Sequence, residues 1–151
     1  MNTSDEDLKQ IDATTKELYA CICFQTGGYP DVDKLNDLII PDGQMINNNG
    51  DEPLAMSVDD FIGIYKDKLE SGVIKSFYEG EIFSKTELFG KVAHRFSTYE
   101  KKYDLEEKEP FSLGINSIQF VKVSNKWKIS SIAWNEQTAN LKIPGSYLSS
   151  G

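Results

Sequence analysis

The side chain best suited to acid–base chemistry in this sequence is its single histidine, His94. Histidine titrates near neutral pH, so an imidazole in a pocket can take a proton from a substrate and return it. His94 and Arg95 are neighbours in a segment of strand character, where alternation turns one side chain toward a pocket and the other away. The pattern does not decide which one points inward. Catalysis by His94 and an ordinary structural role are both open interpretations.

The two cysteines, Cys21 and Cys23, lie two positions apart. Positions i and i+2 of a helix face different sides, so these thiols are not expected to pair with each other. Free buried thiols are typical of a reducing compartment, and we expect a cytoplasmic protein. A redox or metal role for the Cys-x-Cys pair is the alternative. One histidine argues against a catalytic zinc site, which uses several nitrogen or sulfur ligands, and we predict no metal and no cofactor.

Other motifs of catalysis and binding are absent from the sequence. There is no Gly-x-Ser-x-Gly elbow and no phosphate-binding glycine loop. Asp31, Asp33 and Asp37 lack the glycine and the terminal glutamate of an EF-hand loop. These three aspartates are therefore expected to be exposed helix charges.

The charge of the chain narrows the classes of partner. In 151 residues, 24 acidic and 16 basic side chains give a formal net charge of -8, which repels the phosphates of nucleic acids. No stretch reaches the roughly 18 apolar residues that span a membrane, and the acidic N-terminus does not resemble a signal peptide. We expect a single folded domain over residues 1–151 that binds neither nucleic acid nor membrane.

The first half of the chain is predicted to be helical. Residues 5–24 carry apolar side chains at helical spacing, and Ser4 is placed to cap their N-terminus. Residues 31–40 predict a short second helix and residues 44–47 a short strand.

A third helix has the clearest start signal. Ser57 followed three positions later by Asp60 is a variant of the capping box, and Gly72 is placed to end the helix. Phe61 and Tyr65 belong to its apolar stripe.

After Gly72 the periodicity becomes alternating, as in strands. Four strands are predicted, at residues 76–88, 92–101, 111–123 and 126–136, with a surface tail over 138–151. Short turns between them indicate an antiparallel meander, and helices that precede strands indicate an α+β fold. The expected order is α-α-β-α-β-β-β-β. A curved antiparallel sheet wrapped on three N-terminal helices forms a cone, and the open end of a cone is a pocket.

Four segments carry a resemblance to a known superfamily. They are MSVDDF at 56–61, FGKVAHRFSTYE at 89–100, GINSIQF at 114–120 and WKISSIAW at 127–134. Together with the element order, they resemble uncharacterised members of the nuclear transport factor 2-like superfamily, the cystatin-like α+β cone. The resemblance covers about residues 6–137. This superfamily includes ketosteroid isomerases, SnoaL-like cyclases and dehydratases, so the fold alone does not specify a function.

The resemblance implies positions for catalytic groups. Ketosteroid isomerases use a carboxylate base near the end of the first short strand, which aligns near Asn47, and an asparagine cannot act as that base. They also use a tyrosine of the first helix as an oxyanion donor, a place that Tyr19 would fill. Dehydratases of the superfamily use pocket histidines with a carboxylate, which points again to His94.

A set of pocket residues follows from the resemblance and the strand alternation. Asn116 and Gln119 face opposite sides of their strand, as do Trp127 and Trp134 on theirs. Core packing is the ordinary fate of both tryptophans. The predicted ligand-binding residues are Tyr19, Asn47, Phe61, Tyr65, Asn116 and Trp134.

Three hypotheses of function remain. The first is a binding domain for a small apolar or aromatic molecule. The second is an enzyme of lyase, isomerase or cyclase type that uses His94 with Tyr19 or Asn116. The third is an interaction domain that forms a homodimer through the outer face of its sheet. The missing carboxylate at Asn47 favours binding.

Overall fold

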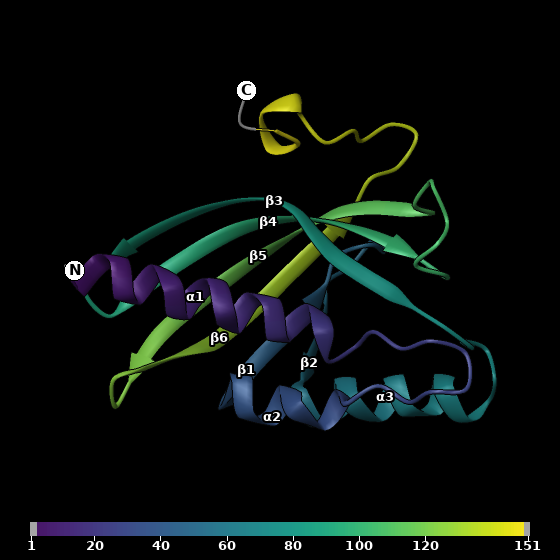
Figure 1. Ribbon diagram of the computed structural model, residues 1–151, viewed down its shortest axis with the longest axis horizontal. Helices are drawn as coiled ribbons and strands as arrows, with labels where there is room; N and C mark the ends of the chain where they lie inside the picture. The colour runs from purple at the N-terminus through teal and green to yellow at the C-terminus, as the bar shows by residue number, and fades with distance from the viewer. Residues whose placement is uncertain (1–2, 150–151) are drawn as a thin grey trace.

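The computed structural model describes residues 3–149 (Figure 1). Within these residues the elements are α1 (Thr3–Ala20), the 3₁₀ turn η1 (Val32–Lys34), α2 (Leu35–Leu38), β1 (Ile39–Asn47), β2 (Leu54–Ser57), α3 (Val58–Glu70), β3 (Tyr78–Phe89), β4 (Val92–Lys102), β5 (Ser112–Val123), β6 (Lys126–Glu136) and the 3₁₀ turn η2 (Gly145–Tyr147). The α+β class predicted from the sequence is confirmed. No helix among the described residues is long and apolar enough to cross a membrane.

The strands form one sheet in the order β2-β1-β6-β5-β4-β3. The meander β3 to β6 is antiparallel, as the sequence predicts. β1, however, pairs in parallel with β6, with Met45 opposite Ile132, so the sheet is mixed and the expectation of a wholly antiparallel sheet is wrong. Parallel strands need a long connection, and the chain between β1 and β6 supplies it with α3 and the four strands β2 to β5.

The hairpin of β1 and β2 differs most from the prediction. β1 begins at Ile39, so the second helix stops at Leu38 after a single short α-helical segment. The β-branched pair Ile39 and Ile40 favours a strand over a helix. β2 follows a turn-rich loop and is only four residues long. A strand this short gives no periodic signal in the sequence.

The ends of two helices test the capping predictions. α1 runs over Thr3–Ala20, so Ser4 lies inside its first turn and does not cap it. Ser57 caps α3, because its hydroxyl oxygen accepts a hydrogen bond from the backbone N–H of Asp60 at 3.0 Å. Gly72 follows the helix with φ +77°, the left-handed conformation that glycine adopts without strain.

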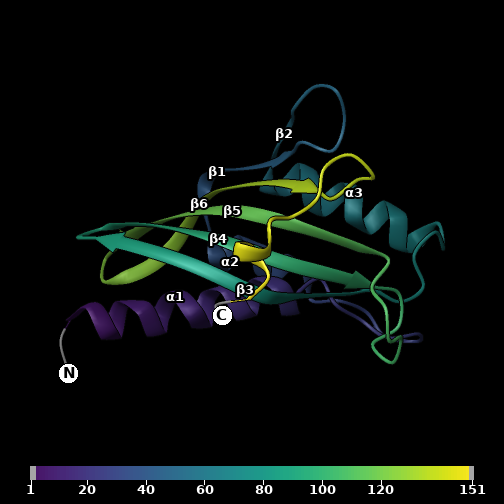
Figure 2. The same cartoon turned by 90° about the horizontal axis from the view of Figure 1, so that it is seen from above.

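α1 covers the inner face of the sheet, with α2 and α3 beside it (Figures 1 and 2). Ile11 of α1, Leu35 of α2, and Ile118 and Ile129 of the sheet are fully buried between these layers. The start of α1 is also fixed by polar contacts. The buried carboxylate of Asp7 accepts hydrogen bonds from the indole of Trp127 at 3.0 Å and from Lys122 at 2.9 Å.

The C-terminal tail folds back onto the outer face of the sheet (Figure 1). The Thr98 hydroxyl donates to the carbonyl oxygen of Tyr147 at 2.6 Å. The rings of Phe96 and Tyr147 meet edge to face, with centroids 5.4 Å apart. The outer face is therefore partly covered within one chain, and the homodimer predicted through it stays a prediction.

Replacing Ser57 with alanine is expected to lower the free energy of unfolding by about 1 kcal/mol, because the Asp60 N–H loses its acceptor. Urea denaturation at neutral pH measures this change. Ser4→Ala is the matched control, since Ser4 lies within its helix, and it should cost less than about half as much. Equal losses for both variants would contradict the assignment of the cap.

Candidate functional site

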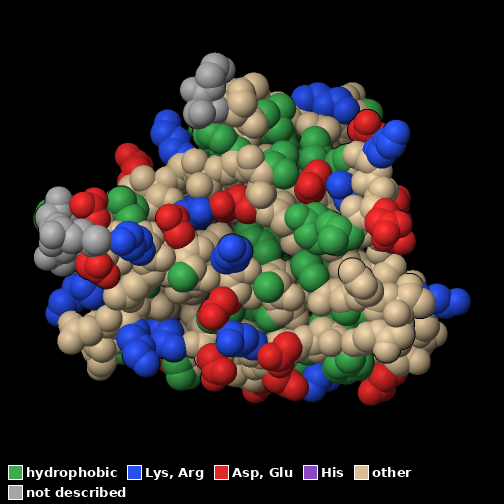
Figure 3. Space-filling view, viewed as in Figure 1, with side chains coloured by type: hydrophobic (Ala, Val, Ile, Leu, Met, Phe, Trp, Pro, Cys, Tyr) green, Lys and Arg blue, Asp and Glu red, His purple; other side chains and the backbone are tan. Residues whose placement is uncertain are grey.

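A cavity of about 340 Å³ lies between the inner face of the sheet and the helices α1 and α3. That volume lies in the range of small-molecule pockets. Aromatic side chains make up much of its wall: Tyr19, Phe61, Tyr65, Phe77, Tyr99 and Trp134. In the space-filling view, hydrophobic side chains gather near the middle of the face, with charged side chains around them (Figure 3).

The structure brings the six predicted ligand-binding residues together on this wall. They come from five elements: Tyr19 from α1, Asn47 from β1, Phe61 and Tyr65 from α3, Asn116 from β5 and Trp134 from β6. Asn116 and Trp134 are register partners, so they share the inner face of the sheet. The ring of Phe61 meets Trp134 edge to face at 6.1 Å. Ligand binding by these residues stays a prediction.

His94 does not share this wall. Its side chain is 54% exposed on the outer face of β4 and its Nε2 lies 2.7 Å from a carboxylate oxygen of Glu87 on β3. Alternation along β4 turns Arg95 inward instead. Of the two alternatives that the sequence left open, Arg95 is the inward residue and His94 the outward one, and this geometry does not support the catalytic role predicted for His94.

The titratable group that the sequence analysis missed is Glu79 of β3. Glu79 is partly buried on the cavity wall, and its burial raises the pKa of its carboxyl to about 7. The charge of Lys101 and a hydrogen bond from Asn116 act to lower this pKa, while the charge of Glu136 raises it further. A carboxyl with a pKa near neutrality is poised for proton exchange.

A signal for Glu79 was present in the sequence. Glu79 and Glu81 are two positions apart on a predicted strand, so the spacing places both carboxyl groups on one face of it. A shift of register between Glu81 and Phe83 leaves Ile82 as the extra residue of a β-bulge. The bulge interrupts the alternation, which is why the segment gives no clean pattern of inner and outer residues.

Lys101 lies opposite Glu79 in the pairing of β3 with β4. Its ammonium nevertheless forms an ion pair with Glu136 of β6. Glu136 also accepts hydrogen bonds from the hydroxyls of Tyr99 at 2.9 Å and Ser112 at 3.0 Å. Glu136 therefore takes up much of the positive charge and donor capacity at this end of the cavity.

Gly114 gives Tyr99 its place in this group. A Cβ atom on Gly114 would lie 2.4 Å from the Tyr99 hydroxyl oxygen and 3.0 Å from the backbone oxygen of Asn135. The hydroxyl end of Tyr99 thus lies where a side chain at position 114 would be. Only glycine allows this approach.

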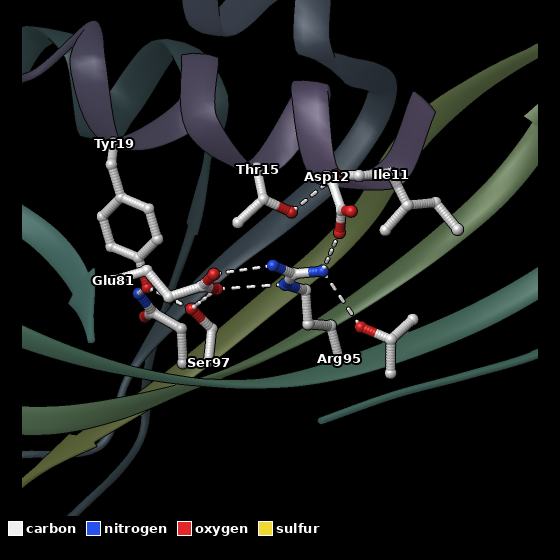
Figure 4. A network of polar contacts seen from close by, with 9 residues as sticks. Ile11, Asp12, Thr15, Tyr19, Glu81, Arg95 and Ser97 are labelled. Carbon is white, nitrogen blue, oxygen red and sulfur yellow. Dashed lines mark hydrogen bonds and ion pairs between the residues drawn. The ribbon is translucent and has the colours of Figure 1, made fainter. Parts of the chain in front are cut away.

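A chain of hydrogen bonds runs under α1 from Arg95 to the cavity (Figure 4). The guanidinium of Arg95 donates to both carboxylate oxygens of Glu81, at 2.6 Å and 3.0 Å, and to Asp12 at 2.7 Å. Ser97 donates its hydroxyl proton to Glu81 at 2.6 Å. Ser97 has one proton, so the hydroxyl of Tyr19, 2.6 Å away, must donate to Ser97.

This chain decides what Tyr19 can do. The Asn116 amide donates to the Tyr19 oxygen at 3.0 Å, while the Tyr19 proton points away from the cavity toward Ser97. Burial raises the pKa of Tyr19, so the hydroxyl stays protonated at neutral pH. The oxyanion-donor role that the resemblance implies for Tyr19 is therefore not supported by its hydrogen bonds.

The two cysteines are free thiols near the end of α1. Burial raises the pKa of Cys21 to about 12 and also raises that of Cys23, so neither thiol favours the reactive thiolate. The sulfur of Cys23 lies 3.4 Å from the backbone nitrogen of Glu79 and 3.3 Å from its carbonyl oxygen. Cys23 therefore helps to hold the backbone of Glu79. Among residues 3–149, no group of three or more His, Cys, Asp or Glu is arranged to hold a metal ion.

Comparison with known proteins gives a fold and no activity. No protein-family profile matches the sequence, and no curated protein matches it. Several solved structures do match. A nuclear transport factor 2-like protein of unknown function from Silicibacter pomeroyi is 15% identical, with a TM-score of 0.63 over 90% of this chain and 100% of that one.

Two further structures agree with this match. A protein of unknown function with a cystatin-like fold from Nostoc punctiforme has a TM-score of 0.70 and 11% identity, over 92% of this chain and 97% of its own. The chain has the nuclear transport factor 2-like fold. A nuclear transport factor 2-like protein from Streptomyces avermitilis, provisionally assigned as a dehydratase, has a TM-score of 0.68 and 16% identity, over 91% of this chain and 100% of its own. At these identities the likeness concerns the fold, as the resemblance predicted.

The raised pKa of Glu79 makes stability depend on pH. The folded-state pKa, about 7, lies above the usual 4.5, so between these values the folded protein holds a proton that the unfolded chain releases. The free energy contributed by Glu79 therefore falls as pH rises from about 4.5 to about 7, and is constant above. Glu79→Gln should gain stability over the wild type across this range, by up to about 3 kcal/mol.

Urea denaturation of both proteins at several pH values measures this difference. Glu52→Gln, in the exposed loop between β1 and β2, is the matched control and should follow the wild-type curve. Parallel curves for wild type and Glu79→Gln would show that the Glu79 carboxyl titrates at its usual pH.

Proposed function

We propose that the protein binds a small, largely apolar molecule in the cavity, with a polar group of that molecule at Glu79 and Asn116. The observation that carries the proposal is the cavity itself, about 340 Å³ in volume, with aromatic walls and a few polar groups among them. Ligand sites commonly combine apolar walls with a few placed polar groups that fix orientation.

Contacts within the protein hold the wall of the cavity in place. The hydroxyl of Tyr65 donates to the carbonyl oxygen of Ile22, which ties α3 to the segment after α1. Phe61 packs between Tyr65, at 6.3 Å, and Trp134, at 6.1 Å. A wall that is already formed costs little ordering on binding, which supports a binding role.

Trp134 reports on the cavity and Trp127 does not, because Trp127 is buried against Asp7 at the start of α1. In a Trp127→Phe variant, neutral aromatic probes such as 2-phenylethanol and 1-naphthol should change the emission of Trp134 in a saturable way. A fluorescence titration measures this change in Trp134 emission as a function of probe concentration.

The matched control is Trp134→Phe, which keeps Trp127 as the emitting residue. Its emission should not respond to the probes. A response of equal size in both variants, or none in either, would count against the cavity as the binding site.

A specific observation favours a second candidate function, an enzyme that transfers a proton. Glu79 combines a place on the cavity wall with a pKa of about 7, and general acid–base catalysis works best when the pKa is near the working pH. The Streptomyces avermitilis protein of similar fold, provisionally a dehydratase, is in line with such chemistry. Glu79 takes the place that His94 had in the original hypothesis.

The compound 5-nitrobenzisoxazole tests this second function, since it needs only a base in an apolar site. The Glu79 carboxylate would remove its ring C–H proton as the N–O bond breaks, and the product is a coloured cyanonitrophenolate. We expect turnover that rises with pH through about 7 and falls at least tenfold in Glu79→Gln. Turnover that is unchanged in Glu79→Gln, with Glu52→Gln as the control, would exclude Glu79 as the base.

A further inference from the structure

We propose that the molecule bound in the cavity carries a protonated amine, held by the Glu79 carboxylate and faced by the aromatic walls. This inference rests on the proposed binding function and names its ligand class. The hydrogen-bond donors, the charges and the aromatic rings around Glu79 support it.

The tyrosine hydroxyls of the cavity offer no proton to a ligand. Tyr19 donates to Ser97, Tyr65 donates to the carbonyl oxygen of Ile22, and Tyr99 donates to Glu136. Each hydroxyl has a single proton, so each donor is already committed to the protein. A ligand that presents an acceptor, such as a carbonyl or a carboxylate, finds no hydroxyl donor here.

The remaining donors near Glu79 are also engaged. The Asn116 amide donates to Tyr19 and hydrogen-bonds to Glu79, and Lys101 is paired with Glu136. The amides of Asn47 and Asn49 also line the cavity, and their side-chain oxygens accept hydrogen bonds from the backbone N–H groups of Asn49 and Glu136, both at 2.8 Å, which places these amides beside β1 and β6. The Glu79 end is therefore an acceptor site, which suits a ligand that donates hydrogen bonds.

The charges at this end favour a cation. Glu79 and Glu136 face the single ammonium of Lys101, so the ionised group carries one net negative charge. Lys68 of α3 lines the cavity from the helix side and reduces this field. The chain as a whole, at a net charge of -8, draws cations toward its surface.

The rings complete a site for an ammonium group. Tyr19, Tyr99 and Trp134 line the same cavity as Glu79, and the faces of aromatic rings attract cations. In this structure the Lys101 ammonium already lies 5.6 Å from the centroid of the Tyr99 ring. The same walls accept the apolar body of an aromatic or aliphatic amine.

Binding of an amine is expected to depend on pH. The groups that face Glu79 are Tyr19 of α1, Cys23 after it, Tyr65 and Lys68 of α3, Tyr99 and Lys101 of β4, Asn116 of β5 and Glu136 of β6. Burial raises the pKa of the three tyrosines and of Cys23, so they stay neutral. Glu79 gains its charge near pH 7, where an alkylamine is still protonated.

Three probes of similar shape test the inference by calorimetry on the full chain: 2-phenylethylamine, 2-phenylethanol and 3-phenylpropionate. At pH 8 we expect the ammonium to bind at least tenfold more tightly than the alcohol, and the carboxylate to bind most weakly. At pH 5.5 the advantage of the ammonium should shrink to less than threefold, because Glu79 is then protonated. Glu79→Gln should abolish the advantage at pH 8 and keep alcohol binding, while Glu52→Gln should match the wild type.

Other results of these titrations would contradict the amine inference, the binding function or both. Equal binding of ammonium and alcohol, or tighter binding of the carboxylate, would overturn the amine inference and leave the binding function standing. An ammonium advantage that survives in Glu79→Gln would also overturn it. Failure of all three probes to bind would count against both the amine inference and the cavity as a site for molecules of this size.

Discussion

The ion pair between Arg95 and Glu81 sets the direction of the hydrogen bonds that lead from it to the cavity. A guanidinium can only donate, so both oxygens of the Glu81 carboxylate must accept. Ser97 is then forced to donate to Glu81, and Tyr19 to donate to Ser97. The orientation of a hydroxyl on the cavity wall is thus decided by a buried charge pair several residues away. In the low polarity beneath α1 such a network is stable only when every member is satisfied, and no fully buried polar side-chain atom in the described part of the chain lacks a partner.

The same inner face explains why acceptors dominate the polar end of the cavity. Glu79, Glu81 and Glu136 all point beneath the helices. Arg95 pairs with Glu81 and with Asp12, and Lys101 pairs with Glu136. Glu81 and Glu136 form direct ion pairs with Arg95 and Lys101. Within residues 3–149, Glu79 forms no direct ion pair and feels the charge of Lys101 only through space. The result is one carboxyl with a raised pKa among carboxylates that are held by their partners.

Sequence reasoning reached the fold and the wall of the cavity, since both follow from periodicity. The cap at Ser57 and the limits of β6 were predicted. The strands predicted at 111–123 and 126–136 leave a two-residue turn between them, which the structure forms with Ser124 and Asn125 at φ values of 49° and 67°. The turn residues of a two-residue hairpin must adopt the left-handed conformation, which asparagine tolerates well. The six predicted wall residues lie together because inward positions of strands and apolar stripes of helices converge on one core.

The remaining features depend on contacts between distant segments. Alternation does not say which of two neighbouring residues on a strand faces the core. On β4 the inward residue is Arg95, whose partners Glu81 and Asp12 lie 14 and 83 residues away in the sequence. The parallel pairing of β1 with β6 and the bulge at Ile82 are likewise fixed by the whole sheet. The spacing of Glu79 and Glu81 shows only that they share one face of a strand, whereas the raised pKa of Glu79 comes from its burial in the folded protein.

Gly114 has a consequence for the size of molecule that the cavity admits. Tyr99 takes its place on the wall only because its hydroxyl end can lie against a position without a side chain. A larger residue there would displace the ring, and so change the depth of the cavity without altering any group that a ligand touches on the other walls. This single backbone position would therefore limit the length of the proposed ligand, independently of the carboxyl proposed to hold the ligand's polar end.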